Sequence, residues 1–247
     1  MGQTEQSLGC LGRMTLPVLI MTRPALASQR FVDAIKPEVL AKLALITSPL
    51  LKIMPTDAVV DLTRYRGVIF TSANGVDHAG NGDGFPAYCV GARTAEAARQ
   101  RGWNASVLGQ NADELIENLI KAPPPAPLLH IGGVHQRGDI AARLTAAGVQ
   151  TDVVAVYDQQ LLPLSIAAQT ALAAGIPCIV PLFSPRTATQ FVADCANLHK
   201  AVVIALSDAV AKPLAQSDIG KLVVADCPNA ASMHIALETA VDWATLP

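Results

Sequence analysis

The chain has 247 residues, of which 51% are hydrophobic and 15% are charged, and its formal net charge is −2. This length suits one large domain or two small ones, and the apolar content is enough for more than one core. The chain has 18 basic and 20 acidic residues, and no basic block occurs. This composition argues against a nucleic-acid partner and favours a small molecule as the ligand.

The N-terminal residues 1–13 form neither a signal peptide nor a lipid-attachment site, because no apolar run follows a basic segment. We expect them to be a disordered extension, and either Met1 or Met14 fits as the start of the natural protein. Pro, Gly, Arg or Asp interrupts every apolar run well short of the roughly 18 residues that a membrane-spanning helix needs. No membrane partner is therefore expected.

The cysteines are scattered, odd in number and without a C-x-x-C pair: Cys10, Cys89, Cys178, Cys195 and Cys227. This pattern indicates neither a disulfide framework nor a zinc site, and it fits the reducing cytoplasm. His130 and His135 flank a glycine turn but have no third ligand at a suitable spacing. We expect no metal ion and no organic cofactor.

Short runs of strand type recur along the chain, and most are followed by an Ala-rich stretch with helical spacing. They cover residues 17–22, 43–47, 68–71, 87–90, 128–131, 153–157, 178–183, 201–206 and 222–225. Such alternation predicts an α/β fold with parallel sheets and crossover helices. Nine strands are many for one sheet, so we expect two lobes, each with about four or five strands.

A repeated plan supports two lobes. Ser72 follows the strand in VIFTSANGV, and Ser184 follows the strand in IVPLFSPRT. At nearly the same distance after each comes a second strand and turn, with Thr94 in one half and Ser207 in the other. Each half is therefore predicted to contain a strand, a Ser turn, a helix, a strand, a Ser or Thr turn and another helix.

Two extended segments set the expected boundaries, Ala44 to Pro55 and Asp152 to Pro163. If they pair, the middle of the chain forms one lobe and the two ends form the other. We expect the first lobe at 14–46 plus 160–247, the second at 52–153, and linker strands at 47–51 and 154–159.

The Ser and Thr turns lie at the carboxyl ends of predicted parallel strands, where loops and helix N-termini bind ligands and favour anions. Each turn alone is explained more simply as a helix cap; Ser184 before Pro185 is a strong cap pattern. Four such turns favour an anionic ligand held by hydroxyl and backbone N–H groups. The nearby cations, which suit carboxylates, are Arg23, Arg93, Arg137, Arg186 and Lys212.

Other catalytic patterns are missing from the sequence. No P-loop occurs, no G-x-G-x-x-G follows a strand, and no catalytic triad or metal cluster emerges. An enzyme of this sequence is expected to work by positioning its substrate and handling protons.

Five segments, VIFTSANGV, CVGARTAEAARQRG, RLTAAGVQTDVVAVYDQ, LFSPRTATQF and IALSDAVAKPL, together and in this order resemble the uroporphyrinogen-III synthase family. The resemblance extends over most of the chain from Leu16 onward. It implies two α/β lobes joined by a two-stranded linker, and it helped to select the strand pairing given above.

The resemblance also implies an activity, the conversion of the linear tetrapyrrole hydroxymethylbilane into uroporphyrinogen III in haem and sirohaem biosynthesis. Loss of the ring A hydroxyl as water gives an azafulvene, which ring D attacks to form a spiro intermediate before closing in inverted orientation. No metal or cofactor takes part in the reaction. A monomeric cytoplasmic enzyme is expected.

The resemblance assigns roles to individual residues. Tyr157 in VVAVYD is expected to be catalytic, as a donor to the departing hydroxyl. The substrate carboxylates are expected to bind Arg23, Ser72, Asn74, Arg93, Thr94, Arg137, Ser184, Ser207 and Lys212. Two features depart from the family pattern: the acidic Asp208 beside Ser207, and Gly132-Gly133 where relatives often carry Arg-Gly.

Two other classes of protein fit the same architecture. One is a non-enzymatic module that senses a tetrapyrrole or another polycarboxylate, although no output domain is evident. The other is a racemase-like enzyme that uses two cysteines, Cys89 and Cys178, across a cleft. Both cysteines are set inside predicted strands, which counts against that role.

Overall fold

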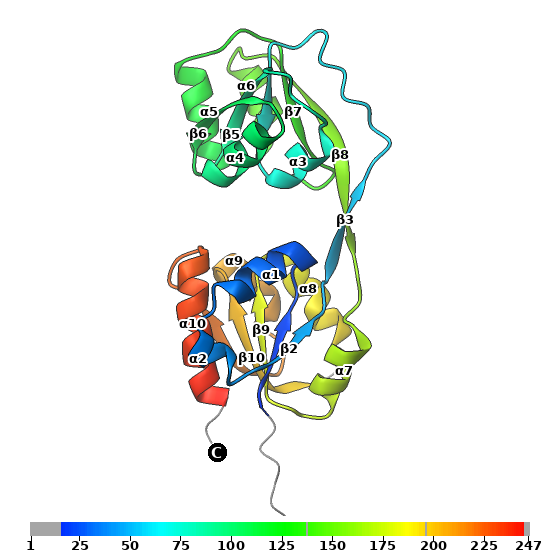
Figure 1. Ribbon diagram of the computed structural model, residues 1–247, viewed down its shortest axis with the longest axis vertical. Coiled ribbons are helices and arrows are strands. Elements are labelled where there is room, and N and C mark those ends of the chain that lie inside the picture. Colours follow the sequence, from blue (N-terminus) through cyan, green and yellow to red (C-terminus); the bar gives the residue numbers. More distant parts are fainter. Residues whose placement is uncertain (1–15, 137, 196, 245–247) are drawn as a thin grey trace, which may run out of the picture. The chain divides into compact units, whose positions relative to one another are not determined.

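The computed structural model describes residues 16–136, 138–195 and 197–244, so the expected N-terminal extension and Arg137 lie outside the described residues. The chain divides into two compact units. Unit 1 contains Met1–Leu51 and Leu161–Pro247, and unit 2 contains Lys52–Gln160. Each unit is built on a sheet with parallel pairing and helices on both faces, which confirms the predicted mixed α/β class (Figure 1).

The sheet of unit 1 has the strand order β11-β10-β9-β1-β2, and its neighbouring strands run parallel. The strands are β1 (Val18–Met21), β2 (Ala44–Thr47), β9 (Cys178–Leu182), β10 (Leu198–Ala205) and β11 (Ile219–Val224). In β1 and β9 every residue is buried, because helices cover both faces of these central strands.

Two hydrophobic cores hold the helices of unit 1 to its sheet. One core packs α7 (Ile166–Ala173), α8 (Pro185–Asp194) and α9 (Asp208–Ala211) on one face, together with a short 3-10 helix at Lys212–Leu214. The other packs α1 (Ala25–Asp33) and α10 (Ala230–Ala244) on the opposite face, where α2 (Pro37–Leu40) also lies.

The sheet of unit 2 has the order β3-β8-β7-β4-β5-β6. Its strands are β3 (Leu51–Pro55), β4 (Gly67–Phe70), β5 (Pro86–Val90), β6 (Asn104–Gly109), β7 (Leu128–Gly133) and β8 (Thr151–Leu161). From β8 to β6 the pairing is parallel. The carboxyl ends of these strands therefore lie at one edge.

Helices cover both faces of the second sheet as well. One core contains side chains of α3 (Ala73–His78) and α4 (Ala92–Gln100), and the other contains side chains of α5 (Ala112–Lys121) and α6 (Ile140–Ala146). Alternate residues of β7 contribute to different cores: Leu128 belongs to the α5 and α6 side, and Leu129 and Ile131 to the α3 and α4 side.

Two details of the sequence prediction were wrong. The first linker strand, predicted at 47–51, is found at Leu51–Pro55. Ser48 and Leu50 instead donate backbone hydrogen bonds to Met21 and Thr22 of unit 1, and Leu50 is fully buried there. Pro49 has no N–H to offer to a ladder.

The second error concerns the number of strands in unit 2. Six strands form its sheet instead of four or five, because β3 joins one edge and β6 the other. The β6 segment has the sequence NASVLG and leaves most of its residues at least partly exposed, so its apolar signal is weak.

No helix within the described residues combines the length and the apolar character that crossing a membrane requires.

Candidate functional site

The hydroxyl groups of Tyr157 and Ser72 meet at the carboxyl edge of the unit 2 sheet. Their oxygens lie 3.2 Å apart, although the residues are 85 positions apart in the sequence. Ser72 follows the end of β4, and Tyr157 stands in β8 opposite Gly133, the last residue of β7. The strand order β8-β7-β4 thus brings the predicted catalytic residue to a predicted binding residue.

Ser72 is also the N-cap of α3. Its backbone is extended, and its Oγ accepts a hydrogen bond from the Gly75 N–H at 3.4 Å. The Ser72 proton therefore remains available for the Tyr157 oxygen. When Ser72 donates that proton, the Gly75 N–H donates to the Ser72 oxygen and the Ser72 hydroxyl donates to the Tyr157 oxygen. The Tyr157 hydroxyl can then donate its own proton to a further acceptor.

The ring of Tyr157 is 5% exposed and fits tightly among its neighbours. A Cβ atom at Gly133 would lie only 2.6 Å from the ring, so this position admits no side chain unless the ring moves. On another side the His78 ring lies 5.8 Å from the Tyr157 ring, between centroids, and its Nδ1 lies 3.0 Å from the Asn74 carbonyl oxygen. Close packing thus restricts the direction of the phenol.

The other predicted residues of unit 2 are more dispersed. Asn74 is half-buried in the first turn of α3, and Arg93 is exposed in the first turn of α4. Thr94 lies next to Arg93 in the first turn of α4, which begins after the N-cap Gly91 at the end of β5, and it is only 7% exposed. Its contact with the substrate stays a prediction.

In unit 1, Ser184 and Ser207 each precede a helix that follows a strand, as predicted. Ser184 Oγ accepts a hydrogen bond from the Thr187 N–H at 3.1 Å and lies 2.9 Å from the Thr187 hydroxyl. Ser207 is the N-cap of α9, but its side chain makes no capping bond there. Lys212 is exposed at the end of the same helix.

Two arginines border the tip of β9 in unit 1. The guanidinium carbon of Arg23 lies 4.4 Å from the centroid of the Phe183 ring, which is a cation–π distance. In turn Phe183 packs edge-on against Phe31. Arg186, in the first turn of α8, has a buried Nη1 with no hydrogen-bond partner among the described residues.

Three comparisons with known proteins bear on this geometry. The family model described as "Uroporphyrinogen-III synthase HemD" matches residues 43–234. The chain belongs to the uroporphyrinogen-III synthase family. This confirms the resemblance and, with it, the expected activity, the cyclisation of hydroxymethylbilane in tetrapyrrole biosynthesis.

Solved structures of this enzyme share the fold. The Helicobacter pylori uroporphyrinogen-III synthetase is 17% identical, with 90% of this chain and 99% of that chain covered and a TM-score of 0.65. A mutant uroporphyrinogen III synthase from the extremely thermophilic bacterium Thermus thermophilus is 12% identical, with coverages of 92% and 99% and a TM-score of 0.51. No curated protein sequence matches the chain.

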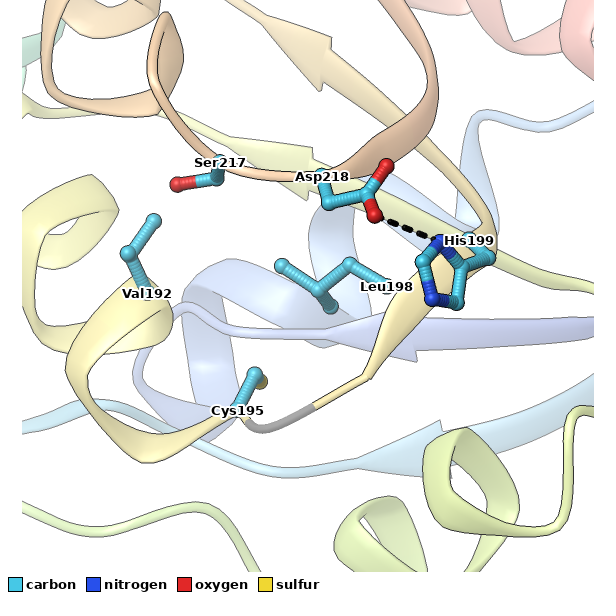
Figure 2. Close-up of a pocket in the computed structure, with 6 residues that line it drawn as sticks. All are labelled: Val192, Cys195, Leu198, His199, Ser217 and Asp218. Carbon is cyan, nitrogen blue, oxygen red and sulfur yellow. Dashed lines mark ion pairs between the residues drawn. The ribbon is translucent and has the colours of Figure 1, made fainter.

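One surface pocket lies away from the strand tips that a uroporphyrinogen-III synthase is expected to use. It has a volume of about 250 Å³ and borders the amino ends of β10 and β11 (Figure 2). His199 and Asp218 meet across its rim at 2.9 Å. Burial raises the pKa of the Cys195 thiol to about 12, with smaller contributions from Asp194 and Cys178, so the thiol is not a ready nucleophile.

Burial affects two further cysteines in the same direction. Cys89 and Cys178 are fully buried, and burial raises the pKa of each thiol to about 11. These values argue against the racemase-like alternative. Among the described residues no group of three His, Cys, Asp or Glu side chains is arranged to hold a metal ion.

Apart from metal binding, the sequence predicts no role for His130. This residue of β7 is 1% exposed, and burial lowers the pKa of its imidazole to about 4. Neither ring nitrogen has a hydrogen-bond partner among the described residues. A single His inside an apolar run gives no pattern from which such a position could be predicted.

Proposed function

We infer that this family member carries out its reaction at the carboxyl ends of the strands, with Tyr157 as the catalytic residue. The product is uroporphyrinogen III, formed with ring D inverted and with loss of water. The observation that carries the proposal is the 3.2 Å approach of the Tyr157 and Ser72 hydroxyl oxygens. It supplies a positioned proton donor at the edge of a parallel sheet where ligands collect.

The chemistry of Tyr157 follows from its hydrogen bonds. The departing ring A hydroxyl needs a proton, and a donor in contact with it stabilises the transition state. Ser72 is fixed by the Gly75 N–H, and when it donates to the Tyr157 oxygen the phenol proton is free for the substrate. A donor in such a position typically accelerates a reaction by about 10²–10⁴-fold.

The remaining site residues bind the substrate in our proposal. Each ring of hydroxymethylbilane carries acetate and propionate side chains, whose carboxylates accept hydrogen bonds. Hydroxyls and cations in both units suit these groups, since charge-assisted bonds are about twice as strong as neutral ones. The proposed ligand-binding residues are Arg23, Ser72, Asn74, Arg93, Thr94, Arg137, Ser184, Ser207 and Lys212.

Finer features of the organisation belong to the same proposal. We take units 1 and 2 as the two lobes of the enzyme, connected where the chain passes between them at Leu51–Lys52 and at Gln160–Leu161. The scattered cysteines support a cytoplasmic protein. The balanced charge supports the absence of a nucleic-acid partner, and we propose that the protein is a monomer.

One assay distinguishes the enzyme from the sensor module. The purified protein is incubated with freshly prepared hydroxymethylbilane, and the type I and type III products are separated after oxidation. The proposal predicts predominantly type III, whereas spontaneous closure gives type I. Tight binding of hydroxymethylbilane with only the spontaneous type I product would identify a sensor and overturn the proposed function.

A further inference from the structure

The buried imidazole of His130 lies on the α5 and α6 side of the unit 2 sheet. His130 and Leu128 project to the same side of β7, because alternate residues of a strand share a face, and Leu128 packs in the core formed with α5 and α6. Its Nδ1 and Nε2 atoms are both buried, and neither meets a hydrogen-bond partner among the described residues. A neutral imidazole has one donor and one acceptor, so burial leaves both unsatisfied.

A buried imidazole with two unpaired nitrogen atoms lowers the stability of the unliganded protein. Buried polar atoms in native structures nearly always have a partner, and the exceptions mark strain, a functional role or a missing ligand. A leucine of similar volume at this position of β7 would pack without any unsatisfied atom. Stability alone therefore gives no reason for His130.

Next to His130, residue 132 is a glycine, and the end of the Gln136 side chain lies against the position that its missing side chain would take. A Cβ atom built on Gly132 would lie 3.5 Å from His130 Nε2 and 3.3 Å from the Nε2 of Gln136. Both nitrogens thus border the position that any other residue would fill with its side chain. Gln136 is exposed in the loop after β7, so its carboxamide can turn aside for a ligand.

We propose that His130, Gln136 and the side-chain position that Gly132 does not fill form a subsite for one carboxylate of the linear tetrapyrrole, which enters when Gln136 turns aside. His130 Nε2–H and the Gln136 amide are both donors, so their common partner is an acceptor, and a carboxylate oxygen forms the stronger, charge-assisted bond. The inference rests on the proposed function. It adds a contact on the α5 and α6 side of β7, whereas Tyr157 packs on the α3 and α4 side of the same sheet.

Three substitutions test the subsite. His130→Leu removes the donor at nearly constant volume, and we expect KM for hydroxymethylbilane to rise about tenfold or more, as for the loss of a hydrogen bond to a charged group. The melting temperature of the unliganded protein should stay equal or rise. Gly132→Ala fills the space with one methyl group, which the flexible end of Gln136 can accommodate, and should also raise KM.

Gln136→Ala removes the second donor and should raise KM several-fold. Its matched control is Gln100→Ala, an exposed glutamine of the same unit whose side chain bonds only Glu96 in α4, and KM should not change there. If His130→Leu fails to fold, Gly132→Ala and Gln136→Ala still decide the matter.

The outcomes separate this inference from the proposed function. Wild-type protein that forms type III product, together with unchanged KM in Gly132→Ala and in Gln136→Ala, would overturn the subsite alone. A changed melting temperature with unchanged KM in His130→Leu would show that the imidazole is only structural. Wild-type protein that forms no type III product would overturn the proposed function itself.

Discussion

The hydroxyl oxygen of Tyr157 lies 3.2 Å from that of Ser72, and the same Ser72 oxygen caps α3 by accepting from the Gly75 N–H. One side chain therefore links the start of a helix to the proposed catalytic phenol. This dual role implies that changes at Ser72 act on both stability and catalysis.

Ser72→Ala removes the cap and the partner of Tyr157 together. The lost cap is expected to lower the free energy of unfolding by about 1 kcal/mol. Turnover should fall as well, because the phenol loses the group that directs its proton. Denaturant unfolding and steady-state kinetics measure the two effects.

A double-mutant cycle identifies the catalytic part of the Ser72 effect. Because Ser72 acts through Tyr157, the loss of turnover in Ser72→Ala with Tyr157→Phe should be much smaller than the sum of the two single losses. Additive losses would mean that Ser72 and Tyr157 act independently.

Gly133→Ala is expected to displace the ring of Tyr157. The added methyl group would lie 2.6 Å from the ring, which is too close for any real contact. We expect a loss of turnover of about tenfold or more, since small displacements of a catalytic group have large effects. Wild-type turnover in a stably folded Gly133→Ala protein would contradict the packing role of Gly133.

Stability should fall in mild acid because of His130. The pKa of this imidazole is lowered from its ordinary value near 6.5 to about 4 by burial. Between these values the unfolded chain binds a proton that the folded protein does not, so the free energy of unfolding decreases as pH falls from about 6.5 to 4. The total decrease is on the order of 3 kcal/mol, at 1.36 kcal/mol for each pKa unit.

The contribution of His130 is isolated by comparison with His130→Leu. The free energy of unfolding is measured with urea at pH 7.5, 6, 5 and 4. In the wild type it should decrease as the pH falls, and in His130→Leu the decrease should be smaller by the contribution of His130, on the order of 3 kcal/mol. Parallel pH profiles for the two proteins would mean that His130 titrates normally in the folded state.

Activity should survive prolonged chelation. A metal site usually needs at least three His, Cys, Asp or Glu side chains close together. The described part of the chain contains no such group. Turnover is measured after dialysis against a strong chelator and again after metal is added back. Activity that disappears on dialysis and returns only with one metal would contradict a reaction driven by side chains alone.

The fold was largely predictable because most strands are buried apolar runs. Fully buried β1 and β9 gave clear signals, whereas β6, which leaves most of its residues partly or fully exposed, was missed. The linker strand was displaced because Ser48 and Leu50 bond to unit 1, a tertiary preference that local sequence does not express.

The candidate site was only partly predictable. Ser72 was predicted from its turn and Tyr157 from the family resemblance, but their contact depends on the strand order β8-β7-β4 and cannot be read from residues 85 positions apart. The role of Gly133 becomes evident only from the ring that packs against it.

Tyr157→Phe tests the account most directly, because it keeps the ring and removes only the hydroxyl. Tyr65→Phe is the matched control, since the Tyr65 hydroxyl bonds Asp152 and Arg64 in the same unit, away from the Ser72 contact. Its turnover and isomer ratio should be those of the wild type. We measure turnover, product isomers and melting temperature for both variants with fresh hydroxymethylbilane.

For Tyr157→Phe the account predicts a turnover loss of about 10²–10⁴-fold, little change in melting temperature, and a larger share of type I product. The type I share rises because released intermediate closes without inversion. Near-normal turnover and isomer ratio in a stably folded Tyr157→Phe protein would contradict the account.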